Sequence, residues 1–260
     1  MNKKLIAVLH LPPLPGSPRC EMSRDEIWQR AHQEAETYVH AGIQTLIIEN
    51  HGDAPFFPDE NPAHVSSFVA VLADRIKRAF GCQIGINLLR NDARGSLAAA
   101  AASGAEFVRV NVLSGVAATD QGLVSGKAHE LMRERRAIEA PTEIWADINV
   151  KFATQLYQPN LADLAKATAQ RSLADAIIVT GPATGRAADP EDLRAAKNAV
   201  GSCPVYVGSG VTAESVGSFL SVCDGVIVGS DLKKDGYVEN PIDPTRLATF
   251  VAAFEKAQST

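Results

Sequence analysis

Short apolar segments alternate with longer amphipathic segments along the whole chain. The apolar segments have the length and composition of buried strands, and we predict strands at residues 4–10, 44–50, 82–89, 107–113, 143–150, 175–180, 204–207 and 225–228. Between them, apolar residues recur with helical spacing, as in Val65, Phe68, Val69 and Leu72 of the second amphipathic segment. Such alternation of strands and helices is typical of a parallel sheet covered by helices.

Capping signals mark where several of the predicted helices begin. Ser23 and Glu26 form a capping box ahead of the first helix, and Gly42 ends it. Asp189-Pro190 places a capping residue before a first-turn proline. Eight strand–helix units follow one another without an obvious linker. We therefore predict an α/β fold, a single (β/α)8 TIM barrel over residues 1–260, with an open doubly wound sheet as the alternative.

Two glycine-containing loops follow the last two predicted strands. Gly208-Ser209-Gly210-Val211-Thr212 comes after strand 204–207, and Gly229-Ser230 comes after strand 225–228. Glycine lets a backbone approach an anion closely, and the N–H groups at a helix start attract negative charge. In TIM barrels a phosphate commonly binds after strands seven and eight. We therefore predict a phosphate site formed by Gly208, Ser209, Gly210, Gly229 and Ser230.

Polar side chains gather late in the other predicted strands, where the functional residues of a barrel emerge. Arg109 and Asn111 share one face of their strand because strand side chains alternate. A charged and amide series on one face of an apolar strand indicates that this face lines a wet cavity. The candidate catalytic residues are His10, Glu49, Arg109, Asp147 and Lys151. The candidate substrate-binding residues are Asn50, Asn87, Asn111, Asn149 and Thr180.

Most of the candidate catalytic residues allow two interpretations. Glu49 and Asp147 are candidates for a general base or acid, because a cavity can tune the pKa of a carboxyl group. Arg109 and Asp147 could instead form a structural ion pair inside the barrel. Lys151 could hold a phosphate or carboxylate as a fixed charge, which we favour, or form a Schiff base. His10 could be a hydrogen-bonded structural histidine.

Sequence signals for metal, nucleotide and serine-hydrolase chemistry are weak or missing. Glu49, His51, Asp53 and Asp147 offer metal ligands, yet the chain has no H-x-H or H-E-x-x-H element. It also has no G-x-x-x-x-G-K-[ST] loop and no G-x-S-x-G elbow. We expect no metal and no cofactor, and keep a metal-dependent hydrolase as a remote alternative.

Composition and charge limit the partners that we expect. The net charge of −5 argues against binding to a phosphate backbone, so we expect no nucleic-acid partner. The apolar start is too short for a membrane span or a signal peptide and is interrupted by prolines, so we expect no membrane partner. The four cysteines are scattered without a C-x-x-C pair, which fits a reducing, cytoplasmic location. We also expect a homo-oligomer, in which an exposed helix face is buried.

Several motifs along the chain together resemble those of the BtpA/SgcQ family. They are His10-Leu11-Pro12-Pro13-Leu14-Pro15-Gly16-Ser17-Pro18, Glu49-Asn50-His51-Gly52-Asp53-Ala54-Pro55-Phe56, Asn87-Leu88-Leu89-Arg90-Asn91-Asp92, Arg109-Val110-Asn111, Thr119-Asp120-Gln121-Gly122, Gly208-Ser209-Gly210-Val211-Thr212 and Asn240-Pro241-Ile242-Asp243. The similarity covers nearly the whole chain. One position departs from the family pattern, because Lys151 is followed by Phe152 where the pattern has histidine.

The resemblance implies a phosphate-binding TIM barrel whose chemistry is poorly defined. One branch of the family is named for a role in photosystem I biogenesis, and another occurs with genes of sugar uptake and sugar-phosphate conversion. We predict an enzyme that acts on a small phosphorylated sugar or ribosyl compound, by aldol-type cleavage or isomerisation. The alternative is a non-catalytic assembly or stability factor.

Overall fold

Eight parallel strands close into a barrel in the computed structural model, which describes residues 3–148, 153–156, 160–181 and 188–259. Around the barrel they follow the order β1 (Lys4–His10), β11 (Gly225–Val228), β10 (Val205–Val207), β9 (Ala176–Val179), β7 (Glu143–Ile148), β4 (Phe107–Val110), β3 (Gln83–Asn87) and β2 (Thr45–Glu49). The pairing of β2 with β1 closes the ring. All eight strands fall within predicted strand segments, so the predicted α/β barrel is confirmed.

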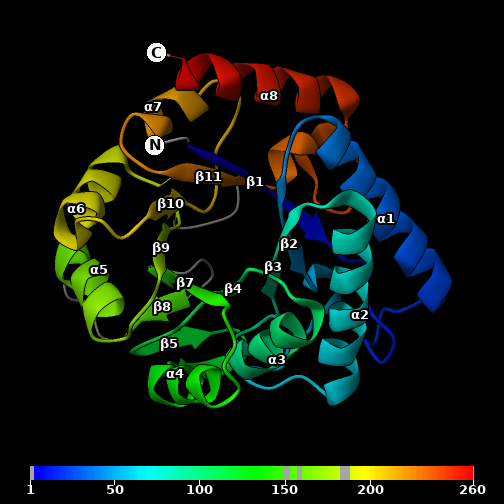
Figure 1. The fold of residues 1–260 in the computed structure, drawn as a ribbon, viewed down its shortest axis with the longest axis horizontal. Helices are drawn as coiled ribbons and strands as arrows, with labels where there is room; N and C mark the ends of the chain where they lie inside the picture. Colours follow the sequence, from blue (N-terminus) through cyan, green and yellow to red (C-terminus); the bar gives the residue numbers. More distant parts are fainter. Residues whose placement is uncertain (1–2, 149–152, 157–159, 182–187, 260) are drawn as a thin grey trace.

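Helices surround the barrel on its outside, as Figure 1 shows. They are α1 (Arg24–His40), α2 (Ala63–Phe80), α3 (Ala93–Ser103), α4 (Ala128–Ala137), α5 (Leu161–Gln170), α6 (Pro190–Val200), α7 (Val216–Leu220) and α8 (Pro244–Gln258). The predicted capping box is present: the Ser23 N–H donates to the Glu26 carboxylate at 2.7 Å, and the Ser23 hydroxyl accepts from the Glu26 N–H. Helix α7 begins only at Val216, because a turn closed by the Ser215 N–H and the Thr212 carbonyl follows the loop 208–212 first.

A small sheet beside the barrel was missed by the sequence analysis. No strand is predicted at residues 114–126, yet this segment forms β5 (Val116–Thr119) and β6 (Gly122–Ser125), an antiparallel hairpin. A third strand, β8 (Ala153–Gln155), pairs with the other edge of β5. Ala117 and Val124 pack on Val112 and are the single buried residues of β5 and β6, and β8 has no fully buried residue. Such a pattern is too brief to predict a strand.

The interior of the barrel has two layers along its strands. In the lower layer, Phe107 of β4 stacks on Trp145 of β7 with ring centroids 3.6 Å apart, and Trp145 stacks on Tyr206 of β10 at 4.6 Å. Two residues further along β4 and β7, Arg109 and Asp147 take the place of the rings. The lower layer therefore fills the barrel, and the upper layer makes its mouth polar.

No helix in the described ranges combines the length and the apolar character that crossing a bilayer needs.

Candidate active site at the barrel mouth

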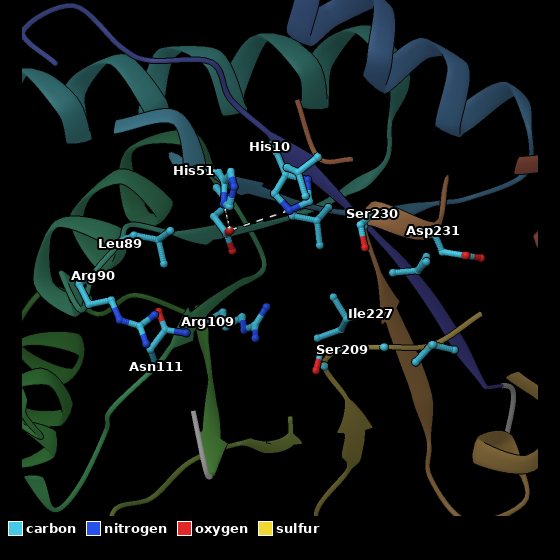
Figure 2. A pocket seen from close by; sticks show the side chains of 18 of the residues that line it. His10, His51, Leu89, Arg90, Arg109, Asn111, Ser209, Ile227, Ser230 and Asp231 are labelled. Carbon is cyan, nitrogen blue, oxygen red and sulfur yellow. Dashed lines mark ion pairs between the residues drawn. The ribbon is translucent and has the colours of Figure 1, made fainter. Parts of the chain in front are cut away.

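A cavity of about 160 Å³ opens at the carboxyl ends of the barrel strands. A volume of this size accepts a small molecule rather than a polymer. Figure 2 shows three groups of polar side chains around it, two histidines, two arginines and two serines, namely His10, His51, Arg90, Arg109, Ser209 and Ser230. Active sites of TIM barrels lie at this end, because loops after every strand converge there.

The histidine side of the cavity is built by β1 and β2. His10 and Glu49 end these two strands and are direct partners in their register, and His51 follows in the short 3-10 segment η1 (His51–Asp53). Glu49 Oε1 lies 3.9 Å from His10 Nε2 and 3.5 Å from His51 Nδ1. Burial raises the pKa of the Glu49 carboxyl, but the hydrogen bond from His51 and the charges of His10 and Arg109 outweigh burial and hold this pKa well below its usual range. Glu49 is therefore a carboxylate.

The arginine side is anchored by a buried ion pair across β4 and β7. Arg109 Nε and Nη2 each lie 3.1 Å from an oxygen of Asp147, and Asn111 Nδ2 donates to Asp147 at 2.6 Å. The Asp147 side chain has no solvent exposure and does not line the cavity, whereas Arg109 and Asn111 do. Burial lowers the pKa of Arg109, yet Asp147 and Glu49 more than compensate and raise it above its usual value. Of the two interpretations of Asp147, this geometry favours the structural ion pair.

Three of the predicted substrate-binding residues, Asn50, Asn87 and Thr180, are buried beside the cavity and do not line it. Asn87 donates to Glu49 Oε2 at 2.9 Å, which fixes the carboxylate. Asn50 accepts from the Leu89 N–H at 2.7 Å and donates to Asp53 at 3.0 Å, so it joins the loops after β2 and β3. Thr180 is buried after β9. None of the three lines the cavity in the part of the chain that the structure describes.

The two glycine loops both line the cavity, but their backbone N–H groups differ in their hydrogen bonding. The Gly208 N–H donates to the Val179 carbonyl at 2.8 Å and is therefore engaged within the barrel, although Gly208 lines the cavity. Gly208 instead leaves space, since an added Cβ would lie 2.5 Å from Ile178. By contrast, the N–H groups of Ser209, Gly210 and Ser230 donate to no acceptor among the described residues. These three N–H groups are available to an anion.

Buried contacts hold both glycine loops in place. The Ser209 hydroxyl accepts from the Gly181 N–H at 3.0 Å. After β11, Asp231 pairs with Arg246 at 3.0 Å, and Lys233, with no exposed surface, pairs with Glu34 of α1 at 2.6 Å. The loop after β11, which includes the cavity-lining residue Ser230, is therefore fastened to both α8 and α1.

Sequence reasoning missed Arg90 and understated His51. Arg90 is 9% exposed and lines the cavity opposite the histidines (Figure 2), although it comes directly after predicted strand 82–89, where barrel site residues are expected. Burial lowers the pKa of Arg90 despite nearby carboxylates such as Asp147 and Asp120. Two other predicted site residues, Asn149 and Lys151, lie outside the described residues.

Known proteins are similar to this chain over nearly its whole length. A family model described as the BtpA family matches residues 1–256. The photosystem I biogenesis protein BtpA of Synechocystis sp. is 43% identical over 97% of this chain and 88% of its own length. Among solved structures, thiamine phosphate pyrophosphorylase from Pyrococcus furiosus superposes with a TM-score of 0.61 at 12% identity, covering 98% of this chain and 96% of its own.

A second solved structure shows the same barrel. N-(5'-phosphoribosyl)anthranilate isomerase from Pyrococcus furiosus superposes with a TM-score of 0.57 at 13% identity, over 97% of this chain and 99% of its own. At these identities the two structures share the fold with this chain, and both are named for reactions of phosphorylated compounds.

Proposed function

Because this chain belongs to the BtpA family, we propose that it is an enzyme that acts on a small phosphorylated sugar or ribosyl compound, by isomerisation or aldol-type cleavage. One observation carries the proposal. The cavity at the barrel mouth is lined by two arginines and the two glycine loops as well as by a carboxylate with two imidazoles. The names of the barrels with the same fold support a phosphorylated substrate.

The phosphate group binds at the serine and arginine side of the cavity in this proposal. The N–H groups of Ser209, Gly210 and Ser230 donate to its oxygens, and Arg90 supplies a positive charge from another wall of the same cavity. Arg109 stands beside the loop after β10, since its Nη2 would lie 3.4 Å from a Cβ at Gly208. A dianionic phosphate at this place would offset the burial of both arginine charges.

The reacting carbons then lie toward Glu49. Its carboxylate accepts a proton from the substrate as a general base, and Asn87 keeps it in position. Arg109 stabilises the enolate-like charge that develops, because it is already oriented by Asp147. Lys151 comes three residues after β7 in the sequence. From this position alone we propose it as a fixed charge or a nucleophile.

Ligand-dependent thermal unfolding tests the phosphate site. We expect inorganic phosphate and ribose 5-phosphate to raise the Tm with concentration, because a ligand at 100 times its Kd adds about 2.7 kcal/mol to the free energy of unfolding. Arg90→Gln should move the response to higher ligand concentration. Arg133→Gln, which removes an exposed guanidinium on α4, is the matched control and should respond as the wild type does. A flat response of the wild type to both ligands would contradict the proposal.

The name of the Synechocystis relative favours a second function, assistance in assembling a protein complex. A protein of this kind acts through its surface, so its binding to a partner would not depend on the polar mouth. Glu49→Gln and Arg90→Gln separate the two functions, because they would abolish turnover of a sugar phosphate and leave assembly unchanged. Complementation of a strain that lacks the family member, with wild type and the two variants, decides between them.

A further inference from the structure

His10, Glu49 and His51 form a compact group of metal-ligand side chains at one wall of the cavity. Their nearest nitrogen and oxygen ligand atoms all lie within 4.8 Å of one another, and Figure 2 shows both imidazoles turned toward the same carboxylate oxygen. The strand register creates the group, because His10 of β1 and Glu49 of β2 are paired residues. His51 then reaches back from two residues beyond the strand.

The two separations from Glu49 are close to those that a bound metal would set, and the two imidazole nitrogens lie within 4.8 Å of each other. A first-row metal about 2.1 Å from each of two ligands holds those ligands roughly 3.4 Å apart at the tetrahedral angle. Glu49 Oε1 lies 3.5 Å from His51 Nδ1, and 3.9 Å from His10 Nε2. The first distance already fits, and the second needs a side-chain shift of about half an ångström.

The surroundings fix the carboxylate in the orientation that a metal needs. Asn87 donates to Glu49 Oε2 at 2.9 Å and leaves Oε1 directed at the two imidazoles. Metal-binding carboxylates are typically held by such a second hydrogen bond. Gly229 leaves room for the imidazole of His10, since an added Cβ there would lie 2.6 Å from His10 Cε1 and would displace the ring.

The other acidic residues that the sequence offered as ligands are engaged elsewhere. Asp53 accepts from the Leu14 N–H at 2.7 Å and from Asn50, so it fastens the loop after β2. Asp147 is enclosed by Arg109 and Asn111. Two imidazoles and one carboxylate therefore make up the donor set, a combination that favours Zn²⁺, Co²⁺, Mn²⁺ or Fe²⁺ over Mg²⁺ or Ca²⁺.

We propose that His10, Glu49 and His51 bind one divalent transition-metal ion at the mouth of the barrel. Three protein ligands leave coordination positions open toward the cavity, as in catalytic rather than structural sites. The metal would polarise a carbonyl or hydroxyl of the substrate beside the phosphate, and Glu49, once it is a ligand, would hold the ion in place of acting as the general base. This role rests on the proposed function, whereas binding of the ion can be measured without any substrate. The proposal replaces the expectation of a metal-free site.

Cobalt titration of the full-length protein, after removal of bound metal with a chelator, tests the site. We expect visible d–d absorption that saturates at one equivalent of Co²⁺ and is bleached by Zn²⁺. His10→Gln, Glu49→Gln and His51→Gln should each abolish it. Asn87→Ala, which removes the hydrogen bond to the carboxylate, should weaken Co²⁺ binding about 10- to 100-fold. His129→Gln, on the exposed surface of α4, is the matched histidine control and should bind as the wild type does.

Two results would overturn the metal proposal. One is a wild type without cobalt absorption, and the other is ligand variants that bind Co²⁺ as tightly as the wild type does. Circular dichroism of each metal-free variant shows that it is folded, so that lost absorption reports a lost ligand. The thermal response to phosphate distinguishes the two ideas, because that response can persist when metal binding fails and can be lost in Arg90→Gln while Co²⁺ still binds.

Discussion

The lower and upper layers of the barrel interior differ in chemistry although the same strands build both. On β4 the inward side chains change from Phe107 to Arg109, and on β7 they change from Trp145 to Asp147. The lower layer is an aromatic stack, which gains free energy from burial of apolar surface and from contact between the rings. The upper layer buries charges, which is costly unless they are paired. Stability should therefore depend most on the lower layer, and ligand binding on the upper one.

The largest expected effect lies in the lower layer. Trp145→Ala should reduce the free energy of unfolding by about 3–5 kcal/mol, because it opens a cavity between two stacked rings that are held by the barrel. Urea denaturation measures the loss. Trp28→Ala, at the half-buried second tryptophan on α1, is the control and should cost less. A loss at Trp28 equal to that at Trp145 would remove the distinction between the barrel interior and its outer helices.

The second prediction concerns the ion pair that supports the upper layer. Asp147→Leu should cost about 3 kcal/mol, since it leaves the Arg109 guanidinium buried without its partner. The double variant with Arg109→Met should recover most of this loss, because no unpaired charge remains. Denaturation of both variants gives the two values. A double variant as unstable as Asp147→Leu alone would show that the pair itself, and not the stranded charge, holds the layer together.

A smaller effect is expected at the loop after β11. Lys233→Met leaves the buried Glu34 carboxylate without its lysine partner, and we expect a loss of about 1.5–3 kcal/mol. The loss is no larger because Arg30, 3.5 Å away, remains beside Glu34. The phosphate-dependent rise in Tm should also shrink as the Ser230 loop loosens. Lys234→Met, at the exposed neighbouring lysine, should leave both quantities unchanged. An unaltered phosphate response in Lys233→Met would separate the lysine from the site.

The smallest effect on stability should come from Arg90, in the upper layer. A lysine or arginine whose pKa is lower in the folded state than in the unfolded state is destabilising when charged, and burial lowers the pKa of Arg90. Arg90→Gln should therefore change the free energy of unfolding by less than about 1 kcal/mol, or increase it, while phosphate binding weakens. Unfolding and phosphate titration of the same preparation provide the comparison. A large loss of stability would mean that Arg90 belongs with the structural charges.

The fold was predictable because its strands are continuous apolar runs. For the polar mouth, the sequence indicates which residues lie late in their strands but not which of them contact one another. Strand alternation places Arg109 and Asn111 on one inner face, as the structure shows. The strand register is what brings His10 beside Glu49, and register cannot be read from one strand. Arg90 was missed because it follows its strand rather than ending it, and the hairpin β5–β6 because its apolar pattern is too short.

The small sheet has a consequence for engineering of the family. Because β8 is hydrogen-bonded to β5, residues 116–125 after β4 and residues 153–155 after β7 form one folded unit, although 26 residues lie between Gly126 and Ala153. The Leu156 N–H, which donates to the Val116 carbonyl at 2.9 Å, extends the link. Exchange of either loop alone between two relatives would leave a strand edge without its partner, so chimeric barrels should be built by moving both segments together.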